Sequence, residues 1–413
     1  VGVMRVPRNF GWAARRTREV LADEGAAGVR RRSVSYLRRR RAAGPGPLQR
    51  LPMDDARPHP WPRSIVMIAD TEPPQCYHYR VEQKIQACRH LGIPFQVVGP
   101  ASATTVASAV QLASIVIVFR QSPQPGLLAG LDQCRRLGLP VVFEADDAVH
   151  DRALVAANPN LDTVPGTLRR QVVSGTDGYR DMLTRADHVL ASTPRLAAEL
   201  GRNVPGRAFV MENGIDDGML EIAEGIRRDP APPPREPDTI VIGYGSGSRA
   251  HDSDLAVAAA GLADVLAEDP AVRLHLMGPV RTPPELVRFA DRIKRTPELV
   301  YGEYLRQLAS CDLTIAPLVD LPFNYYKSQV KVLEAAVVGV PLIASPVVYR
   351  DYVVPGRTAL LADDHQWAEQ VRRLVADSGL REQLTTAARA HLSDSLVDRR
   401  PARQLAEMVT ALS

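Results

Sequence analysis

An alternation of apolar strands and helical segments runs through this chain twice, once on each side of a proline-rich segment at 229–238. That segment carries five prolines, and because proline fixes φ and lacks an N–H group, it is neither a helix nor a central strand. Apolar strands separated by helices are typical of a parallel sheet covered on both faces. The sequence therefore predicts an α/β protein with two doubly wound domains, at 64–228 and 239–395, joined by a semi-rigid linker.

The expected strands are short apolar runs, and the expected helices carry apolar residues at helical spacing. In the first domain the strands lie at 64–69, 95–98, 115–119, 141–145, 188–192 and 209–212, and in the second at 239–242, 272–277, 313–316 and 342–344. The helix expected at 254–268 places Leu255, Leu262 and Leu266 on one stripe. Ligands of doubly wound sheets bind at the carboxyl ends of the strands, so we expect the site in the loops there.

The ends of the chain differ from its body in charge and composition. Residues 1–50 carry thirteen arginines and three acids, a net charge of +10 that leaves −6 for the rest of the chain. We expect a basic helical extension there, a proline-rich linker at 51–63, and a final helix at 396–413. A basic extension on a mildly acidic body favours an anionic membrane surface as a partner and argues against nucleic acid. A solvated basic helix is the alternative interpretation.

The composition is that of a globular protein, with 45% hydrophobic and 24% charged residues. The four cysteines are scattered and show no metal-binding spacing, which favours reduced thiols in a cytoplasmic protein. The longest uncharged apolar run, 335–349, is interrupted by glycine and proline and is too short to cross a bilayer. The first residues lack the uninterrupted apolar core of a secretory signal.

The first candidate site is a glycine-rich turn at 243–249, which follows a strand and opens a helix. Glycines let a backbone approach a phosphate, and a helix N-terminus offers free N–H groups and the positive end of its dipole. Gly247 and Ser248 are therefore candidates for binding a nucleotide, and Arg249 is a candidate for stabilising charge on its phosphates. A tight strand-to-helix turn without a ligand is the alternative interpretation.

The second candidate site is the segment 323–334, which leads into a helix. We expect Asn324 to cap this helix, so that Lys327 and Ser328 lie near the free N–H groups of its first turn. Lys327 would then meet a diphosphate. Glu334, about two turns further along the same face, would accept hydrogen bonds from ribose hydroxyls. A surface lysine and a buried structural glutamate are the alternative interpretation.

This second segment resembles the donor-binding segment of the retaining GT-B glycosyltransferases, especially glycosyltransferase family 4. The family pattern has two Glu residues separated by seven positions, the second within Leu-Glu-Ala, and then a Gly-x-Pro turn; here 333–335 and 339–341 match its second part. The first Glu of the pattern, which in the family helps to hold the transferred sugar, falls at Tyr326 and is absent. Lys327-Ser328 followed by a lysine-bearing helix is similar to a variant found in bacterial polysaccharide transferases.

Other matches extend the resemblance over roughly 64–395. Residues 213–216 resemble the segment where the first domain of the family hands over to the second, and 251–254 resemble a submotif of the bacterial variant. Residues 79–82 resemble the first helix of that group at the edge of the cleft, which makes Arg80 a candidate for binding the donor. The resemblance implies two Rossmann-like domains in the GT-B arrangement, the first for the acceptor and the second for a nucleotide sugar. It also implies that the C-terminal helix crosses back to the first domain.

Two groups of acids are further candidates. Asp146 follows a strand of the first domain, at a position similar to a family loop that often carries a His near the anomeric carbon, and it is a candidate to face the sugar. Capping of a turn or helix by Asp147 is an equally good interpretation.

Residues 252–254 spell the Asp-x-Asp pattern of metal-dependent transferases, but they precede a helix whose N-terminus favours acids. We therefore expect no metal and no cofactor besides the donor substrate.

The resemblance implies a metal-independent glycosyltransferase. It would move a hexose-type sugar, with retention, from a nucleotide-diphosphate sugar to a glycan, lipid-linked or small-molecule acceptor. Two other functions fit the same fold. A sugar-nucleotide epimerase would convert the sugar nucleotide without an acceptor. A non-catalytic sugar-nucleotide-binding partner protein, which Tyr326 favours, would bind the donor and turn nothing over.

Overall fold

The computed structural model describes residues 64–228, 238–247 and 252–412. The basic extension at 1–50, the linker at 51–63 and all but the last residue of the second linker lie outside these residues, so the predictions made for them stay predictions. Within the described ranges, no helix is long and apolar enough to cross a membrane.

The first domain is built on a six-stranded parallel sheet with the order β2-β1-β3-β4-β5-β6. Its strands are β1 (Ser64–Ile68), β2 (Phe95–Val98), β3 (Ala113–Phe119), β4 (Val141–Ala145), β5 (His188–Ala191) and β6 (Ala208–Val210). Its helices are α2 (Pro74–Tyr77), the π-helix η1 (His78–Glu82), α3 (Gln83–Leu91), α4 (Ala103–Val110), α5 (Pro125–Leu137), α6 (Arg152–Ala156), the 3₁₀ helix η2 (Pro159–Thr163), α7 (Gly166–Thr184), α8 (Pro194–Gly201) and α9 (Asp217–Arg228). All six expected strands of this domain are present.

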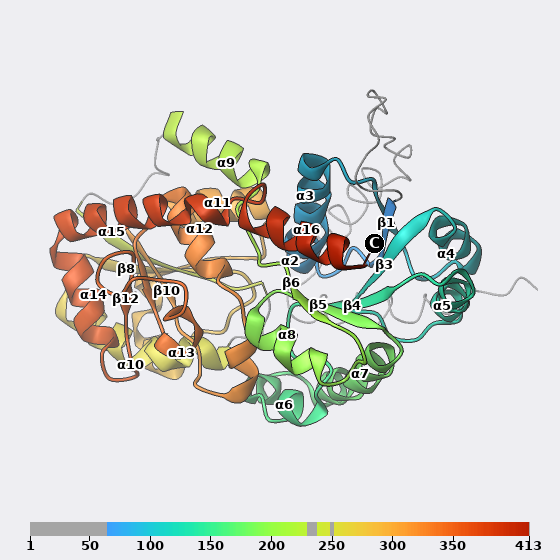
Figure 1. The fold of residues 1–413 in the computed structure, drawn as a ribbon. Coiled ribbons are helices and arrows are strands. Elements are labelled where there is room, and N and C mark those ends of the chain that lie inside the picture. The colour runs from blue at the N-terminus through green and yellow to red at the C-terminus, as the bar shows by residue number, and fades with distance from the viewer. Residues whose placement is uncertain (1–63, 229–237, 248–251, 413) are drawn as a thin grey trace, which may run out of the picture. The chain divides into compact units, whose positions relative to one another are not determined.

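The alternation of side chains along the strands divides the core of the first domain between the two faces of its sheet. Val66 and Ile68 of β1 point to the face that α4 and α5 cover. Ile65 and Met67 point to the opposite face, which packs against α3 and the C-terminal helix. Because both faces are apolar, the sheet is buried between two helical layers, as the sequence predicts (Figure 1).

The second domain has a six-stranded parallel sheet with the order β12-β11-β10-β7-β8-β9. Its strands are β7 (Ile240–Gly245), β8 (Val272–Met277), β9 (Ile293–Thr296), β10 (Leu313–Ala316), β11 (Leu342–Ala344) and β12 (Leu360–Leu361). Its helices are α10 (Asp252–Glu268), the 3₁₀ helix η4 (Pro284–Arg292), α11 (Tyr301–Ala309), the 3₁₀ helix η5 (Pro322–Tyr326), α12 (Val330–Val338), α13 (Pro346–Tyr349), α14 (Trp367–Ala376), α15 (Ser378–His391), the 3₁₀ helix η6 (Leu392–Ser395) and α16 (Arg400–Leu412). The apolar stripe expected on α10 is buried, and two parallel sheets confirm the predicted fold class.

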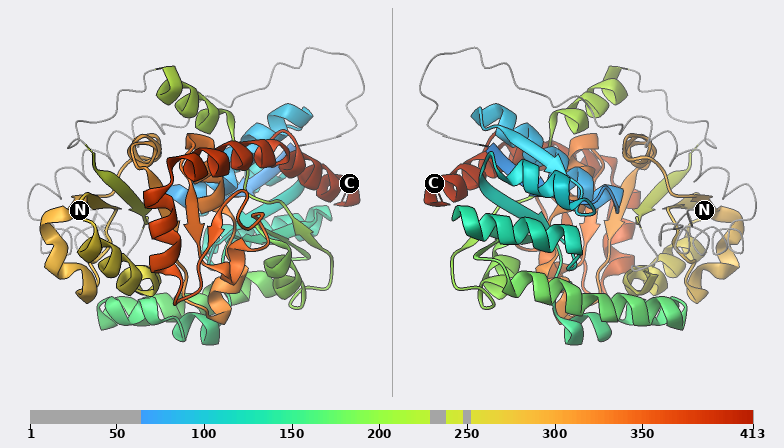
Figure 2. Two further views of the ribbon diagram at one scale, coloured as in Figure 1. Left: turned by 90° about the vertical axis from the view of Figure 1, so that its left-hand side faces the viewer. Right: turned by 90° about the vertical axis from the view of Figure 1, so that its right-hand side faces the viewer.

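Two helices pack away from their neighbours in sequence. Helix α16 lies beside α3, and Leu405 and Met408 join the core of the first domain (Figures 1 and 2). The C-terminal helix therefore crosses back, as the resemblance implies. Helix α9, which precedes the proline-rich linker, packs on α11 and α12, and its Met219 is buried in a cluster with residues of the second domain.

Strands β9 and β12 have no counterpart among the expected strands. Strand β9 carries exposed Lys294 and Arg295, because it is the edge strand of its sheet and has one neighbour only. Strand β12 consists of two residues, which is too short for a periodic signal. Between α2 and α3 the chain forms a π-helical stretch at His78–Glu82. Such stretches occur frequently at functional sites.

Candidate active site

The candidate residues of the second domain follow β7 and β10, the two strands at which the strand order reverses. Loops after such strands flank the crevice in which doubly wound domains bind ligands. The glycine-rich turn follows β7, and the segment that contains Lys327 follows β10. In the first domain the loops after β3 and β4 provide Arg120, Asp146 and Asp147.

The segment before α12 differs from the expected helix start. Residues Pro322–Tyr326 form the 3₁₀ helix η5, Lys327 has an extended backbone, and α12 begins only at Val330. Asn324 does not cap α12, because its side chain is buried and donates hydrogen bonds to Val319 O (2.9 Å) and Asp254 Oδ1 (3.3 Å). The expectation that Lys327 lies on the first turn of α12, on the same face as Glu334, is therefore wrong.

The acids of the Asp-x-Asp pattern hold loops in place. Asp254 Oδ1 accepts a hydrogen bond from Val319 N (3.0 Å), and Asp252 Oδ1 accepts one from Arg281 N (3.0 Å). The side chain of Asn160, from the first domain, contacts both Asp254 Oδ2 (3.4 Å) and Ser253 N (2.7 Å). No group of three or more His, Cys, Asp or Glu side chains in the described part of the chain is placed to hold a metal ion.

Lys327 faces the first domain. Its Nζ lies 3.7 Å from Oδ1 of Asp147 and 5.3 Å from the centroid of the Phe323 ring. The Lys327 side chain is 17% exposed and that of Asp147 is 27% exposed. A cation and a carboxylate therefore meet, partly open to solvent, where the two domains come together.

Glu334 is buried and already bound by protein side chains. Its Oε1 accepts a hydrogen bond from the hydroxyl of Tyr79 (3.2 Å), which comes from the first domain. Its Oε2 accepts hydrogen bonds from Tyr304 (3.0 Å) and from Lys331 Nζ (3.0 Å). Burial, and after it the Glu334 carboxylate, raise the pKa of Tyr79 well above its usual value, so Tyr79 stays a donor. This carboxylate has the acceptor oxygens that a ribose diol requires.

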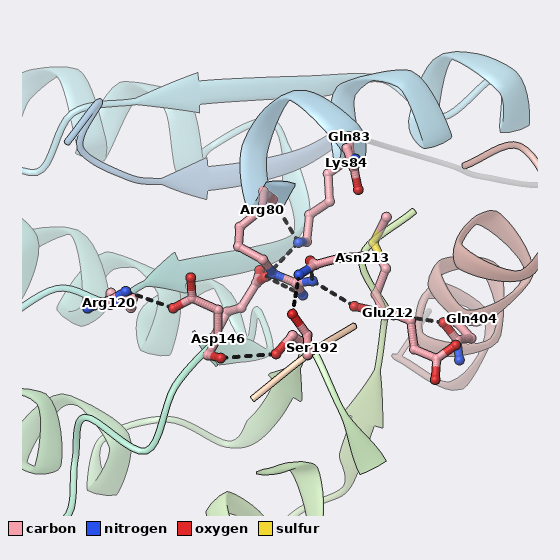
Figure 3. Close-up of polar contacts among 12 residues, drawn as sticks. Arg80, Gln83, Lys84, Arg120, Asp146, Ser192, Glu212, Asn213 and Gln404 are labelled. Atoms are coloured by element: carbon pink, nitrogen blue, oxygen red, sulfur yellow. Dashed lines mark hydrogen bonds and ion pairs between the residues drawn. The ribbon is translucent and has the colours of Figure 1, made fainter. Parts of the chain in front are cut away.

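Arg80 lies in the interior of the first domain (Figure 3). Its guanidinium binds Glu144 Oε1 (2.7 Å), Met211 O (2.7 Å) and Asn213 Oδ1 (2.7 Å). Lys84 Nζ binds the same Glu144 oxygen at 2.6 Å, and all three charged side chains are buried. Burial, followed by the nearby Arg80, lowers the pKa of Lys84 to about 8. This geometry favours a structural role for Arg80, and its predicted contact with the donor stays a prediction.

Asn213 connects Arg80 to the segment that precedes α12. Its Oδ1 accepts from Arg80, and its Nδ2 donates to Ser328 Oγ at 2.9 Å. Gln329 Nε2 donates to the backbone carbonyl of Asn213 at 3.0 Å. The predicted residues Arg80 and Ser328 are thus brought together through Asn213, which lies between β6 and α9.

Asp146 is held by the first domain. Its Oδ1 accepts a hydrogen bond from Arg120 Nη1 (2.8 Å), and its backbone oxygen accepts one from Ser192 Oγ (3.1 Å) (Figure 3). Burial, the largest single influence, opposes the charge of Asp146, but Arg120, Cys76 and Arg80 together outweigh burial and lower the pKa of this carboxyl. Arg120 Nη1 also lies 3.2 Å from Cys76 Sγ. The helix that follows, α6, is capped by Asp151, whose side chain accepts from two backbone N–H groups.

The glycine-rich turn is only partly described. Gly245 ends β7 against the ring of Tyr304, where a Cβ would collide with the ring. Gly247 lies under the side chain of Gln75, from the first domain. Ser248 and Arg249 lie outside the described residues, so their roles stay predictions. The close packing of Gly245 favours the structural interpretation for that glycine.

Sequence reasoning did not assign a role to Tyr301, Tyr304 or Lys331. Tyr301 and Tyr304 lie one turn apart at the start of α11, and the Tyr301 hydroxyl lies 2.5 Å from that of Tyr79. Lys331 lies three residues before Glu334 on α12. The three-residue spacing of Lys331 and Glu334 could have predicted their contact. The contacts of the two tyrosines could not be predicted, because they depend on the packing of α11 on α12.

Comparison with known proteins finds similarity in the second domain and in the fold. Residues 240–377 match the family of glycosyl transferases group 1, which covers most of the second domain. Among solved structures, HepE of Anabaena in complex with UDP-glucose shares 16% identity with this chain, at a TM-score of 0.55 over 84% of this chain and 100% of HepE. The complex of HepE with UDP has a TM-score of 0.54 at the same identity and coverage. An α,α-trehalose-phosphate synthase of Burkholderia xenovorans is 12% identical to this chain. Its TM-score is 0.49, over 75% of this chain and 77% of the synthase. A comparison with curated protein sequences gave no match.

The fold and the paired sheets define a protein of the GT-B class, with two Rossmann-like domains and candidate residues where they meet. Within that class, the second domain carries the sequence pattern of the glycosyl transferases group 1. The resemblance to GT-B glycosyltransferases is thereby confirmed for the fold, and residues 240–377 are similar to the glycosyl transferases group 1.

Proposed function

We propose that this chain is a glycosyltransferase that moves a hexose-type sugar from a nucleotide-diphosphate sugar, with retention of configuration. The observation that carries the proposal is that Lys327 and Glu334, both in the segment similar to the family's donor-binding motif, each contact a side chain of the first domain. The partners are Asp147 and Tyr79, respectively. A site shared by two domains suits a reaction in which each domain holds one substrate.

The donor is proposed to be a nucleotide sugar, bound mainly by the second domain. Glu334 offers carboxylate oxygens for the ribose hydroxyls, and Lys327 offers a cation for the diphosphate. The neighbours solved with UDP and UDP-glucose have the same fold, which supports this class of donor without fixing the base or the sugar.

Transfer breaks the bond between the anomeric carbon and the diphosphate oxygen, and negative charge builds up on the leaving phosphate. Preorganised cations and N–H groups that stabilise such charge usually make the largest contribution to catalysis. Lys327 is proposed to take this role, and Arg249 is proposed to assist. Retention follows when the acceptor attacks from the side of the leaving group. Each step uses groups of the chain and the substrates alone, so we propose that no divalent metal takes part.

The first domain is proposed to bind the acceptor, which is a glycan, a lipid-linked sugar or a small molecule. The arginine-rich extension at 1–50 is proposed to associate with anionic membrane, since each basic residue near such a surface contributes about 1 kcal/mol. Co-sedimentation of the full chain with anionic and neutral vesicles tests this at low and high salt. Equal recovery with both vesicle types would contradict it.

A panel of nucleotide sugars tests the function itself. We expect one of them to raise the melting temperature, to be hydrolysed slowly without an acceptor, and to be used faster with one. These activities should persist in excess chelator. Conversion of the sugar nucleotide into an epimer without release of nucleotide would identify an epimerase instead. Binding without any turnover would identify the non-catalytic protein that Tyr326 favours.

A further inference from the structure

The two adjacent acids after β4 have different surroundings. Asp146 is 13% exposed and bound to Arg120 at 2.8 Å, within the first domain. Asp147 is 27% exposed, and its Oδ1 faces Lys327 across the domain boundary at 3.7 Å. Both residues lie in the bend that follows β4, where their side chains take different partners. Asp147 is therefore the acid of this pair that faces the donor-binding segment.

The contact between Asp147 and Lys327 is an ion pair and not a hydrogen bond. A separation of 3.7 Å exceeds the range of an N–H···O hydrogen bond. The two charges oppose each other without tight contact, and both side chains are partly open to solvent. A ligand group that binds Lys327 therefore lies close to Asp147 as well.

Tyr326 stands where the family pattern has its first Glu, so the second domain has no carboxylate at residue 326. Its hydroxyl donates to Glu199 Oε2 of the first domain at 3.4 Å, and its backbone oxygen accepts from Thr193 Oγ1 at 3.2 Å. The ring packs on the core cluster of the first domain. Tyr326 is thus a contact between domains, and an acid that assists the transferred sugar has to come from elsewhere.

The geometry points to Asp147 as that acid, and we propose that it stabilises the positive charge that develops at the anomeric carbon. This role rests on the proposed function. The anomeric carbon of a nucleotide sugar is two bonds from the phosphorus atom, so a donor whose phosphate binds Lys327 places this carbon beside Asp147. Cation and carboxylate then flank the breaking bond and match the charge separation of the transition state.

The chemical step balances without a further reactant. The C1–O bond to the diphosphate breaks, and its electron pair stays on the phosphate oxygen, next to Lys327. The acceptor oxygen forms the new bond to C1 on the same face, and its proton passes to the leaving phosphate. Asp147 accepts no proton and forms no covalent bond in this step, and it returns to its contact with Lys327 when the nucleotide leaves.

Asp147→Asn tests this role, with UDP and with the best nucleotide sugar of the panel as probes. We expect turnover to fall about 100-fold, while UDP binds as well as before or more tightly, because the amide no longer competes for Lys327. Asp147→Glu should restore part of the turnover. Asp132→Asn, which removes an exposed acid paired with Arg135, is the matched control and should change neither value.

The outcomes separate the two proposals. A wild-type protein that turns over no nucleotide sugar would overturn the proposed function, and with it the role of Asp147. An active wild type with an equally active Asp147→Asn variant would overturn the role of Asp147 alone. A large loss in Asp146→Asn together with normal turnover in Asp147→Asn would also overturn it and return the role to Asp146.

Discussion

The hydroxyl of Tyr79 in the first domain donates a hydrogen bond to Oε1 of Glu334 in the second, at 3.2 Å. The single hydrogen of the Tyr79 hydroxyl is used in this bond to Glu334. The Tyr301 hydroxyl, whose oxygen lies 2.5 Å from that of Tyr79, therefore donates its own hydrogen to Tyr79. The chain thus supplies its own hydroxyl where the proposed function places a hydroxyl of the ribose. Binding of a nucleotide has to displace Tyr79 or share the carboxylate with it.

Tyr79→Phe should therefore tighten the binding of nucleoside diphosphate. Removing a competing hydrogen bond is worth about 0.5–1.5 kcal/mol, which corresponds to an affinity about 2- to 10-fold higher. Calorimetry with UDP measures the change. Tyr325→Phe is the control, since Tyr325 is exposed and its hydroxyl binds Asp320. Weaker binding by Tyr79→Phe would show that Tyr79 helps to hold the ligand.

Lys327→Ala should lower turnover about 10²- to 10³-fold. The variant lacks a group that stabilises charge in the transition state, and losing one such group typically slows a reaction by this factor. The fold should survive, since the side chain is partly exposed and its partner Asp147 stays accessible to water. Nucleotide release gives the rate, and a thermal melt reports the fold. Lys294→Ala, at an exposed position on β9, serves for comparison. Turnover within a few-fold of wild type would refute the role of Lys327.

Glu144→Gln should destabilise the first domain by about 3–5 kcal/mol, because it leaves Arg80 and Lys84 as buried charges without their carboxylate. Chemical denaturation followed by circular dichroism measures the loss. Glu268→Gln removes the carboxylate of an exposed ion pair with Arg372 and should have a much smaller effect. Adding Lys84→Met to Glu144→Gln should recover part of the stability. If the double variant is no more stable than Glu144→Gln alone, the unpaired charges of Arg80 and Lys84 are not the cause of the loss.

His78 should make stability depend on pH. Burial alone would lower the pKa of His78, but its contacts with Asp216 and Glu82 outweigh burial and raise it from 6.5 to about 9. The stabilising contribution is therefore complete below about pH 6.5 and is lost as the pH rises through about 9. We expect the free energy of unfolding of the wild type to fall by about 1–3 kcal/mol relative to His78→Gln over this interval. Parallel pH profiles of the two proteins would contradict this.

The sequence predicts the local structure well because local structure depends on nearby residues. The buried strand at 141–145 has the expected bounds, and the apolar stripe of α10 faces the core. The elements that sequence reasoning missed were short or lay at a sheet edge, as β12 and β9 do. The start of α12 was misplaced, because Asn324 has a distant partner, Asp254, that no local pattern reveals.

The sequence by itself indicated the two sheets and singled out the segment around Lys327 and Glu334. The tertiary structure alone decided the partner of each polar side chain. Arg80 is buried against Glu144, and Lys327 faces Asp147. The physical reason is that periodicity and turn residues act over a few positions of the chain. An ion pair or a buried hydrogen bond instead joins groups that only the packing of distant segments brings within a few ångströms of each other.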